Sequence, residues 1–113
     1  YTMPVRPERV AWSWVQQVAR NRPEKAHRFA IASAPGWDAR AEEQRWGPTL
    51  HRWVYEEGAG YTVRLPSYKN RNRATALVMF NFPGGGRRRF VTIDVCRNES
   101  DGEWKVCGIR QEQ

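Results

Sequence analysis

Two cysteines near the end of the chain are the side chains whose spacing most directly implies chemistry. Cys96 and Cys107 flank an Asp101-Gly102 pair, and Asp-Gly between two strand-like runs strongly indicates a β-hairpin. With Asp101 and Gly102 as a two-residue turn, the cysteines face each other across the hairpin, where Cβ atoms lie about 4.5–5.5 Å apart. A small closure of the ladder then allows a disulfide, which needs about 3.5–4.5 Å. The alternative is two free thiols on one face of the sheet.

The predicted disulfide bears on where the protein works. Disulfides persist in oxidising compartments, so the pairing of Cys96 with Cys107 favours an extracytoplasmic setting: periplasmic, secreted or membrane-anchored. No apolar run approaches the roughly 18 residues of a membrane span, and no signal peptide is recognisable. We therefore expect any anchor to lie in a segment that precedes Tyr1.

The other side chains capable of acid–base or metal chemistry stand apart from one another. His27 and His51 do not cluster with the cysteines or carboxylates at the spacing of metal ligands, so neither a metal nor another cofactor is expected. His27 falls near the packed side of a predicted helix and would be the base of an enzyme site, but a partly exposed helix-face histidine is the favoured interpretation. Asp94 lies in the apolar run VTIDV, where a surface ion pair with Lys105 or Arg97 is favoured over catalysis.

The sequence is strongly basic, with a formal net charge of +7. Arginines gather at two predicted turns, Arg71 and Arg73 at one, and Arg87, Arg88 and Arg89 after a glycine run at the other. Together they predict a basic patch for an anionic surface or for nucleic acid, with an affinity that falls steeply with salt. Solvated turns that keep the protein soluble are the favoured alternative, so nucleic acid is the less favoured partner.

Helical periodicity dominates the beginning of the chain. Pro7 suits a first helical turn, and apolar residues then recur at helical spacing until Asn21 ends the helix. Trp12 lies off this apolar stripe, so it is either half exposed or packed against another element.

Two further helices and an ambiguous segment follow. The second helix begins at Pro23 and stops at Pro35-Gly36, because proline and glycine interrupt helices. The third spans residues 37–46 and ends at Gly47-Pro48. The stretch LHRWVYEEGAG fits either a helical turn or a strand, and the run that begins at Trp53 favours a strand.

Beyond Gly60 the apolar period changes to two, which is typical of half-buried strands. Strands are predicted at residues 61–65, 74–82 and 89–98, and the Asp101-Gly102 hairpin completes an antiparallel meander. The face of this hairpin that should lie against the helices carries Val91, Ile93, Val95, Trp104 and Val106. Residues 1–113 are thus expected to form one α+β domain, with 1–46 mostly helical and 50–110 forming a curved antiparallel sheet.

The opening PERVAWSWVQQVARNRPEKAHRFA, the strands and the closing DGEWKVCGI together resemble the nuclear transport factor 2-like (cystatin-like) superfamily. The closing residues are also similar to the ends of small secreted or lipoprotein domains of bacteria. The resemblance implies a cone, in which the curved sheet wraps around the helices and leaves one end open. The candidates for lining such a pocket are Trp14, His27, Trp53, Tyr55, Phe80 and Trp104.

The superfamily includes dehydratases, isomerases, transport adaptors, channel scaffolds and binding modules, so the fold does not give the function. The leading hypothesis is a non-enzymatic, extracytoplasmic binding or assembly module with a protein partner in the cell envelope, including a scaffold role in type IV secretion or conjugation. The rival is a small dehydratase-like or isomerase-like enzyme that uses the cone pocket, with His27 as base. A basic nucleic-acid-binding domain with reduced cysteines is the third. Because superfamily members often dimerise through the outer sheet face, a homodimer is a further candidate.

Overall fold

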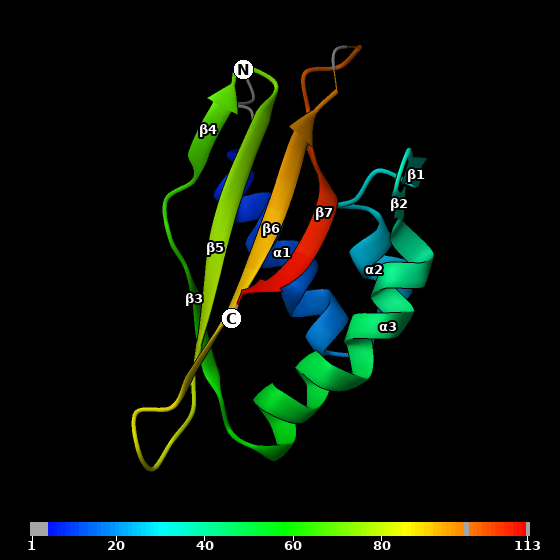
Figure 1. Ribbon diagram of the computed structural model, residues 1–113. Coiled ribbons are helices and arrows are strands. Elements are labelled where there is room, and N and C mark those ends of the chain that lie inside the picture. The colour runs from blue at the N-terminus through cyan, green and yellow to red at the C-terminus, as the bar shows by residue number, and fades with distance from the viewer. Residues whose placement is uncertain (1–4, 99, 113) are drawn as a thin grey trace.

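The structure, a computed structural model, describes residues 5–98 and 100–112. The elements in chain order are α1 (Pro7–Ala19), α2 (Pro23–His27), β1 (Ser33–Ala34), β2 (Trp37–Asp38), α3 (Ala39–His51), the π-helical η1 (Arg52–Glu56), β3 (Gly60–Val63), β4 (Ser67–Asn70), β5 (Arg73–Asn81), β6 (Arg88–Arg97) and β7 (Trp104–Glu112). The helices pack against the antiparallel sheet, which confirms the predicted α+β class (Figure 1). No helix in the described ranges has both the length and the apolar character that crossing a membrane requires.

Helix α1 crosses one face of the sheet and supplies much of the core (Figure 1). Pro7 occupies its first turn, where a missing backbone N–H costs nothing. The apolar residues at helical spacing are buried, as predicted: Val10, Ala11, Trp14, Val15 and Val18. The helix ends just before Asn21, whose φ of 60° lies in the left-handed region. Trp12 points away from the apolar stripe and keeps 38% of its surface exposed.

The second helix is shorter than the sequence indicated. It ends at His27, and the backbone then extends beside β7, where Val106 N donates to Phe29 O at 2.8 Å and Ile31 N donates to Val106 O at 2.9 Å. Ser33–Ala34, predicted as helix, instead pairs with β2 in a small hairpin. The second helix is shorter than predicted because residues 29–31 pair with the edge of β7. This pairing gives hydrogen-bond partners to backbone groups of β7 that would otherwise have none.

Helix α3 passes through Gly47-Pro48, where the sequence predicted its end, and η1 carries the helical backbone on to Glu56. The predicted strand around Trp53 is therefore wrong, and the meander begins at Gly60. Pro48 costs the helix one backbone hydrogen bond. Burial outweighs that loss, because Leu50 is 0% and Trp53 is 3% exposed in the core that this longer helix completes.

The sheet has the strand order β3-β5-β6-β7, and β4 pairs with β5 along the same edge as β3. Strands β5 and β6 form the central pair, from Arg73 opposite Cys96 to Asn81 opposite Arg88. The centre of the face toward the helices is fully buried and contains Ala74, Ala76, Val78, Phe80, Val91, Ile93, Val95 and Val106. This is the face that the period-two pattern predicted.

The hairpin of β6 and β7 contains the predicted disulfide, but in a different register. Cys96 and Cys107 are bonded, with their Cα atoms 5.9 Å apart. Cys96 nevertheless pairs with Lys105, and Cys107 is an extra residue in β7 between the paired Val106 and Gly108. This β-bulge brings the second sulfur to the first without a directly opposed pair.

The turn of this hairpin is also longer than the two-residue turn predicted. Asn98 N donates to Glu103 O at 2.8 Å, and Gly102 N donates to Asn98 O at 2.7 Å, so the loop closes around more than Asp101 and Gly102. Gly102 adopts a φ of 73°, which glycine reaches without steric cost.

Asp94 forms an ion pair, but with Arg110 and not with the predicted Lys105 or Arg97. Its Oδ2 lies 2.7 Å from Arg110 Nη1, and its Oδ1 accepts a hydrogen bond from Thr75 Oγ1 at 3.0 Å. The predicted partners Lys105 and Arg97 are engaged elsewhere, since Lys105 Nζ donates to a carbonyl that follows α2. The bulge shifts the register of β7, and this shift brings Arg110 to Asp94.

Candidate functional site

Three of the six predicted pocket residues fill the space between the helices and the sheet. Trp14 and Phe80 are 0% exposed and Trp53 is 3% exposed. The rings of Trp53 and Phe80 are inclined by 69° in an edge-to-face arrangement, with centroids 5.1 Å apart. The interior in which a cone pocket was predicted is thus occupied by aromatic side chains.

The other two aromatic candidates lie nearer the surface and far apart in the fold. Trp104, at the start of β7, is half-buried and meets the ring of Tyr68 with centroids 6.1 Å apart. Tyr55, in η1, is 54% exposed and stacks on His51 with centroids 5.0 Å apart. The structure therefore does not gather the predicted pocket residues around one cavity.

His27 lies beside a buried carboxylate, Glu43, which was not among the predicted site residues. Its Nδ1 is 3.5 Å from Glu43 Oε1, and Glu43 is 3% exposed. The other oxygen, Oε2, accepts a hydrogen bond from Trp14 Nε1 at 3.1 Å. These contacts connect α1, α2 and α3 through the buried carboxylate of Glu43. Within the described ranges, no group of three or more His, Cys, Asp or Glu side chains is arranged to hold a metal ion.

The predicted basic patch is divided between the two ends of β5. Arg71 and Arg73 lie at its beginning, whereas residues 87–89 lie beside its end, roughly 25 Å away at the rise of an extended strand. Arg87 Nη2 is 2.6 Å from Glu57 Oε1, and Arg89 lies over an aromatic ring of η1. The five arginines therefore do not form one continuous surface.

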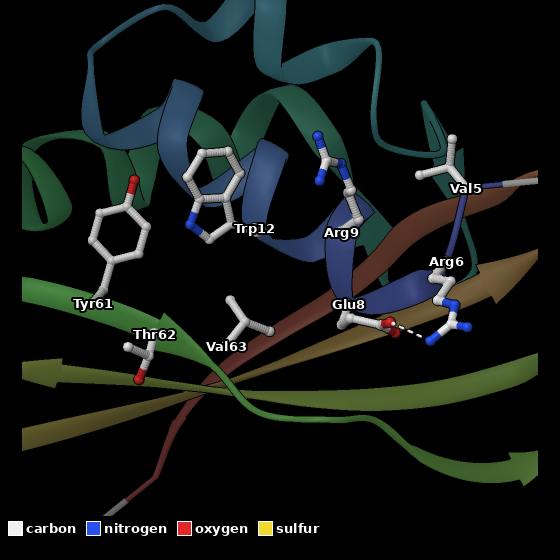
Figure 2. A pocket seen from close by; sticks show the side chains of 8 residues that line it. All are labelled: Val5, Arg6, Glu8, Arg9, Trp12, Tyr61, Thr62 and Val63. Carbon is white, nitrogen blue, oxygen red and sulfur yellow. Dashed lines mark ion pairs between the residues drawn. The ribbon is translucent and has the colours of Figure 1, made fainter.

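A groove of about 690 Å³ opens between the beginning of α1 and strand β3 (Figure 2). Its lining residues are Val5, Arg6, Glu8, Arg9, Trp12, Tyr61, Thr62 and Val63. The rings of Trp12 and Tyr61 have centroids 6.4 Å apart and planes inclined by 35°. Because Val5 and Trp12 are 55% and 38% exposed, the groove offers apolar surface to a ligand.

The amphipathic helix and the alternating strand explain why this groove forms. Trp12 and Trp14 are two residues apart, a rotation of about 200° around a helix, so burying Trp14 turns Trp12 away from the core. On β3, Tyr61 pairs with the buried Phe80, and their rings lie 5.5 Å apart. One side of Tyr61 thus completes the core, and the other side contributes to the groove.

The charged side chains at the groove are mainly cationic. Arg6 and Arg9 are exposed, and Arg6 Nη1 lies 4.0 Å from Glu8 Oε1. The second Glu8 oxygen is buried and has no hydrogen-bond partner among the described residues. A ligand that brings its own negative charge would meet the two guanidinium groups at the rim.

The phenol of Tyr61 stays protonated at neutral pH. Burial raises its pKa above the ordinary value of 10.0, the nearby Tyr55 raises it further, and the positive charge of Arg20 partly opposes both. Tyr61 therefore presents a neutral O–H group that can donate or accept a hydrogen bond.

None of the residues that line this groove was among the predicted site residues. The available signal was Trp12, a large aromatic side chain on the polar side of an amphipathic helix. Its counterpart on β3 could not be identified from the sequence, because only the fold brings Tyr61 beside it.

Comparisons with known proteins bear on the fold. No protein-family model matches the sequence, and no curated protein is significantly similar to it. The chain is similar to the solved structure of Bd1075 from Bdellovibrio bacteriovorus, with a TM-score of 0.52 and 16% identity, over 92% of this chain but only 39% of that one. A scytalone dehydratase-like protein from Novosphingobium aromaticivorans has a TM-score of 0.47 and 13% identity, over 94% of this chain and 81% of that one, a likeness too weak for any argument. The likeness to Bd1075 concerns the fold alone, in which helices pack on an antiparallel sheet.

Proposed function

We propose that the protein is a non-enzymatic, extracytoplasmic binding module that holds a segment of a partner protein in the groove between α1 and β3. The observation that carries the proposal is the open aromatic pair of Trp12 and Tyr61, flanked by Arg6 and Arg9. Aromatic and arginine side chains are enriched at protein interfaces, where they contribute most of the binding energy.

The filled interior supports a groove ligand over a small-molecule substrate. Trp14, Phe80 and Trp53 are between 0% and 3% exposed, and they occupy the space in which the cone pocket of an enzyme would lie. A substrate could enter only if these side chains moved out of the core. The groove needs no such rearrangement.

The disulfide supports the oxidising setting of this proposal. Cys96 and Cys107 are bonded, and stable disulfides are rare in reducing compartments. Within the cell envelope, such a module serves in assembly, for example as a scaffold domain of a secretion or conjugation complex. The compartment is tested by counting free thiols in protein taken from its natural host without reductant. We expect none, and two titratable thiols would contradict an oxidising location.

The groove is tested by photo-crosslinking in the host cell. A photoreactive residue replaces Arg9 at the groove, and a matched control replaces Arg40, an exposed arginine of α3. We expect the first probe to give a discrete crosslinked protein that disappears in the Trp12→Ala variant, and the control probe not to give it. The groove is not the binding surface if the crosslink persists in Trp12→Ala, if both probes give the same product, or if neither reacts. A nucleic-acid adduct would support the basic nucleic-acid-binding hypothesis in its place.

A further inference from the structure

Among residues 5–98 and 100–112, no segment pairs with the outer backbone edge of strand β3 beside the groove. All four of its residues pair with β5 on the other side. Just beyond the strand, Arg64 N donates to Leu77 O at 2.9 Å, and hydrogen-bonded positions alternate along an antiparallel ladder. Thr62 therefore turns its N–H and C=O toward β5, whereas Tyr61 and Val63 turn theirs outward, away from the sheet.

The side chains of the same two residues face α1. Figure 2 shows Tyr61 and Val63 on β3 opposite Trp12 of the helix. A peptide that paired with the outward backbone groups would run along the rim of the groove in an extended conformation. Every second side chain of that peptide would lie beside the exposed apolar surface of Trp12 and Val5.

The charges along this rim are complementary to an acidic peptide. Residues 5–12 and 60–70 contain four cations, Arg6, Arg9, Arg64 and Lys69, and one carboxylate, Glu8. All four cations are exposed, and Glu8 already lies near Arg6. Acidic side chains on the peptide would be attracted to the rim and basic ones repelled.

Protection against aggregation explains only part of this arrangement. The edge strand is short, and Pro66 and charged residues follow it, which are features that prevent edge-to-edge pairing between molecules. Trp12 and Val5 do not contribute to protection against aggregation, because both leave apolar surface exposed beside the edge. At the opposite edge of the sheet, in contrast, a segment of the chain pairs with β7 at Val106.

We propose that β3 binds an extended acidic segment of the partner by β-strand addition, with the backbone of Tyr61 and Val63 pairing to the segment and Trp12 receiving its alternate side chains. This inference rests on the proposed function, because it specifies the chemistry of the ligand in the same groove.

The first test selects peptides on the intact, oxidised protein from a displayed library of random octapeptides. We expect the enriched peptides to be acidic, with apolar residues at alternate positions. Their affinity for Trp12→Ala should be about tenfold weaker, the change expected when one well-packed aromatic contact is lost. Arg9→Gln should weaken binding several-fold and reduce its dependence on salt.

The second test addresses the backbone pairing. Val63→Pro removes an N–H that points away from β5, and proline is tolerated in an edge strand when its N–H side faces outward. We expect it to weaken binding of the selected peptides by roughly tenfold, whereas Val63→Ala, which keeps the N–H, should weaken it less. Methylation of each peptide nitrogen in turn should reduce binding at every second position, and this result does not depend on whether Val63→Pro folds.

The outcomes separate this inference from the proposed function. Peptides that are neutral or basic, or that tolerate methylation at every nitrogen, would overturn β-strand addition, although loss of binding in Trp12→Ala would still support the groove. A library without any enriched peptide would also overturn it. The crosslinking experiment at Arg9 would then decide the proposed function independently.

Discussion

The two edges of the sheet are organised in opposite ways. At Val106 of β7 the chain covers its own edge, because the segment Phe29–Ile31 exchanges two hydrogen bonds with this residue. The disulfide also joins β7 to β6. Along β3 the backbone groups of Tyr61 and Val63 point outward beside the exposed ring of Trp12. We call these regions the closed side (β7, residues 29–31, α2 and α3) and the open side (β3 and the groove).

Two tryptophans of α1, which are two residues apart, show the same contrast between the closed and the open side. Trp14 faces the closed side, is 0% exposed and donates its indole N–H to the buried Glu43. Trp12 faces the open side and is 38% exposed. Free strand edges and exposed aromatic rings promote aggregation unless they are covered. Because the chain covers such groups on one side, we interpret their exposure on the other side as a binding property.

The largest expected effect is the difference in stability between the alanine variants of these two tryptophans. Trp14→Ala should lower the free energy of unfolding by about 3–5 kcal/mol, since it leaves a cavity and removes the hydrogen bond to Glu43. Trp12→Ala should lower it by about 1 kcal/mol or less, because the side chain is partly solvated. Urea unfolding followed by circular dichroism measures both values. Equal losses would show that Trp12 is a core residue, and the distinction between the two sides would fail.

The disulfide should give the next largest effect. Replacing both Cys96 and Cys107 with serine should cost about 2–3 kcal/mol, because the bridge restricts the unfolded chain over a sequence separation of 11. Thermal unfolding measures the loss, and reduced wild-type protein is the matched control. Since the bridge lies on the closed side, the folded variant should bind groove ligands with unchanged affinity. A change in affinity would show that the two sides are coupled.

Much of the fold could be predicted from local patterns. The stripe of α1, the buried face of the meander and the cysteine pairing follow from side-chain periodicity and from residue types at turns. The π-helical turn that contains Trp53 was wrongly predicted as a strand, because its apolar residues satisfy both periods. Gly47-Pro48 usually ends a helix, but here the burial of Leu50 and Trp53 holds the helical backbone beyond it.

Long-range pairing explains the remaining differences. The bulge at Cys107 and the extended segment after His27 both depend on what lies beside β7, which no local pattern shows. The groove depends in the same way on the approach of β3 to α1. The sequence marks Trp12 as unusual because it lies off the apolar stripe, but its partner Tyr61 is defined only by the tertiary fold.

A smaller effect is expected at Gly108, on the closed side. A Cβ atom at this position would lie 2.7 Å from Asp94 Oδ2, so Gly108→Ala should displace Asp94 from Arg110 and Thr75. We expect a loss of about 1–3 kcal/mol in the free energy of unfolding.

The matched control for this substitution is Gly85→Ala. No heavy atom lies within 4 Å of a Cβ at Gly85, so we expect a change of less than about 0.5 kcal/mol. Urea unfolding of the two variants tests the comparison. If Gly108→Ala were as stable as Gly85→Ala, the close packing of β7 on Asp94 would not contribute to the stability of the closed side.

The smallest expected effect is the alkaline titration of Tyr61, on the open side. Burial and the neighbouring Tyr55 raise the pKa of Tyr61 above 10.0, while Arg20 opposes them. Below pH 10 the phenol is protonated in both the folded and the unfolded chain, so its stabilising contribution is fully present. As the pH rises beyond that value the unfolded chain loses the proton first, and the free energy of unfolding falls until the folded phenol has also ionised. Tyr61→Phe should not show this alkaline fall in the free energy of unfolding. The difference between the pH profiles of the wild-type protein and Tyr61→Phe therefore isolates the contribution of the Tyr61 phenol.

An acidic peptide in the groove should raise the pKa of Tyr61 further, because it adds negative charge and removes more water from the phenol. The difference in phenolate absorbance between wild-type protein and Tyr61→Phe, measured with and without a selected peptide, reports this shift. Tyr55→Phe is the control, since it removes the other phenol near Tyr61 but keeps the groove. If the peptide bound without moving the titration of Tyr61, its acidic groups would lie away from β3, and the position assigned to the ligand on the open side would be wrong.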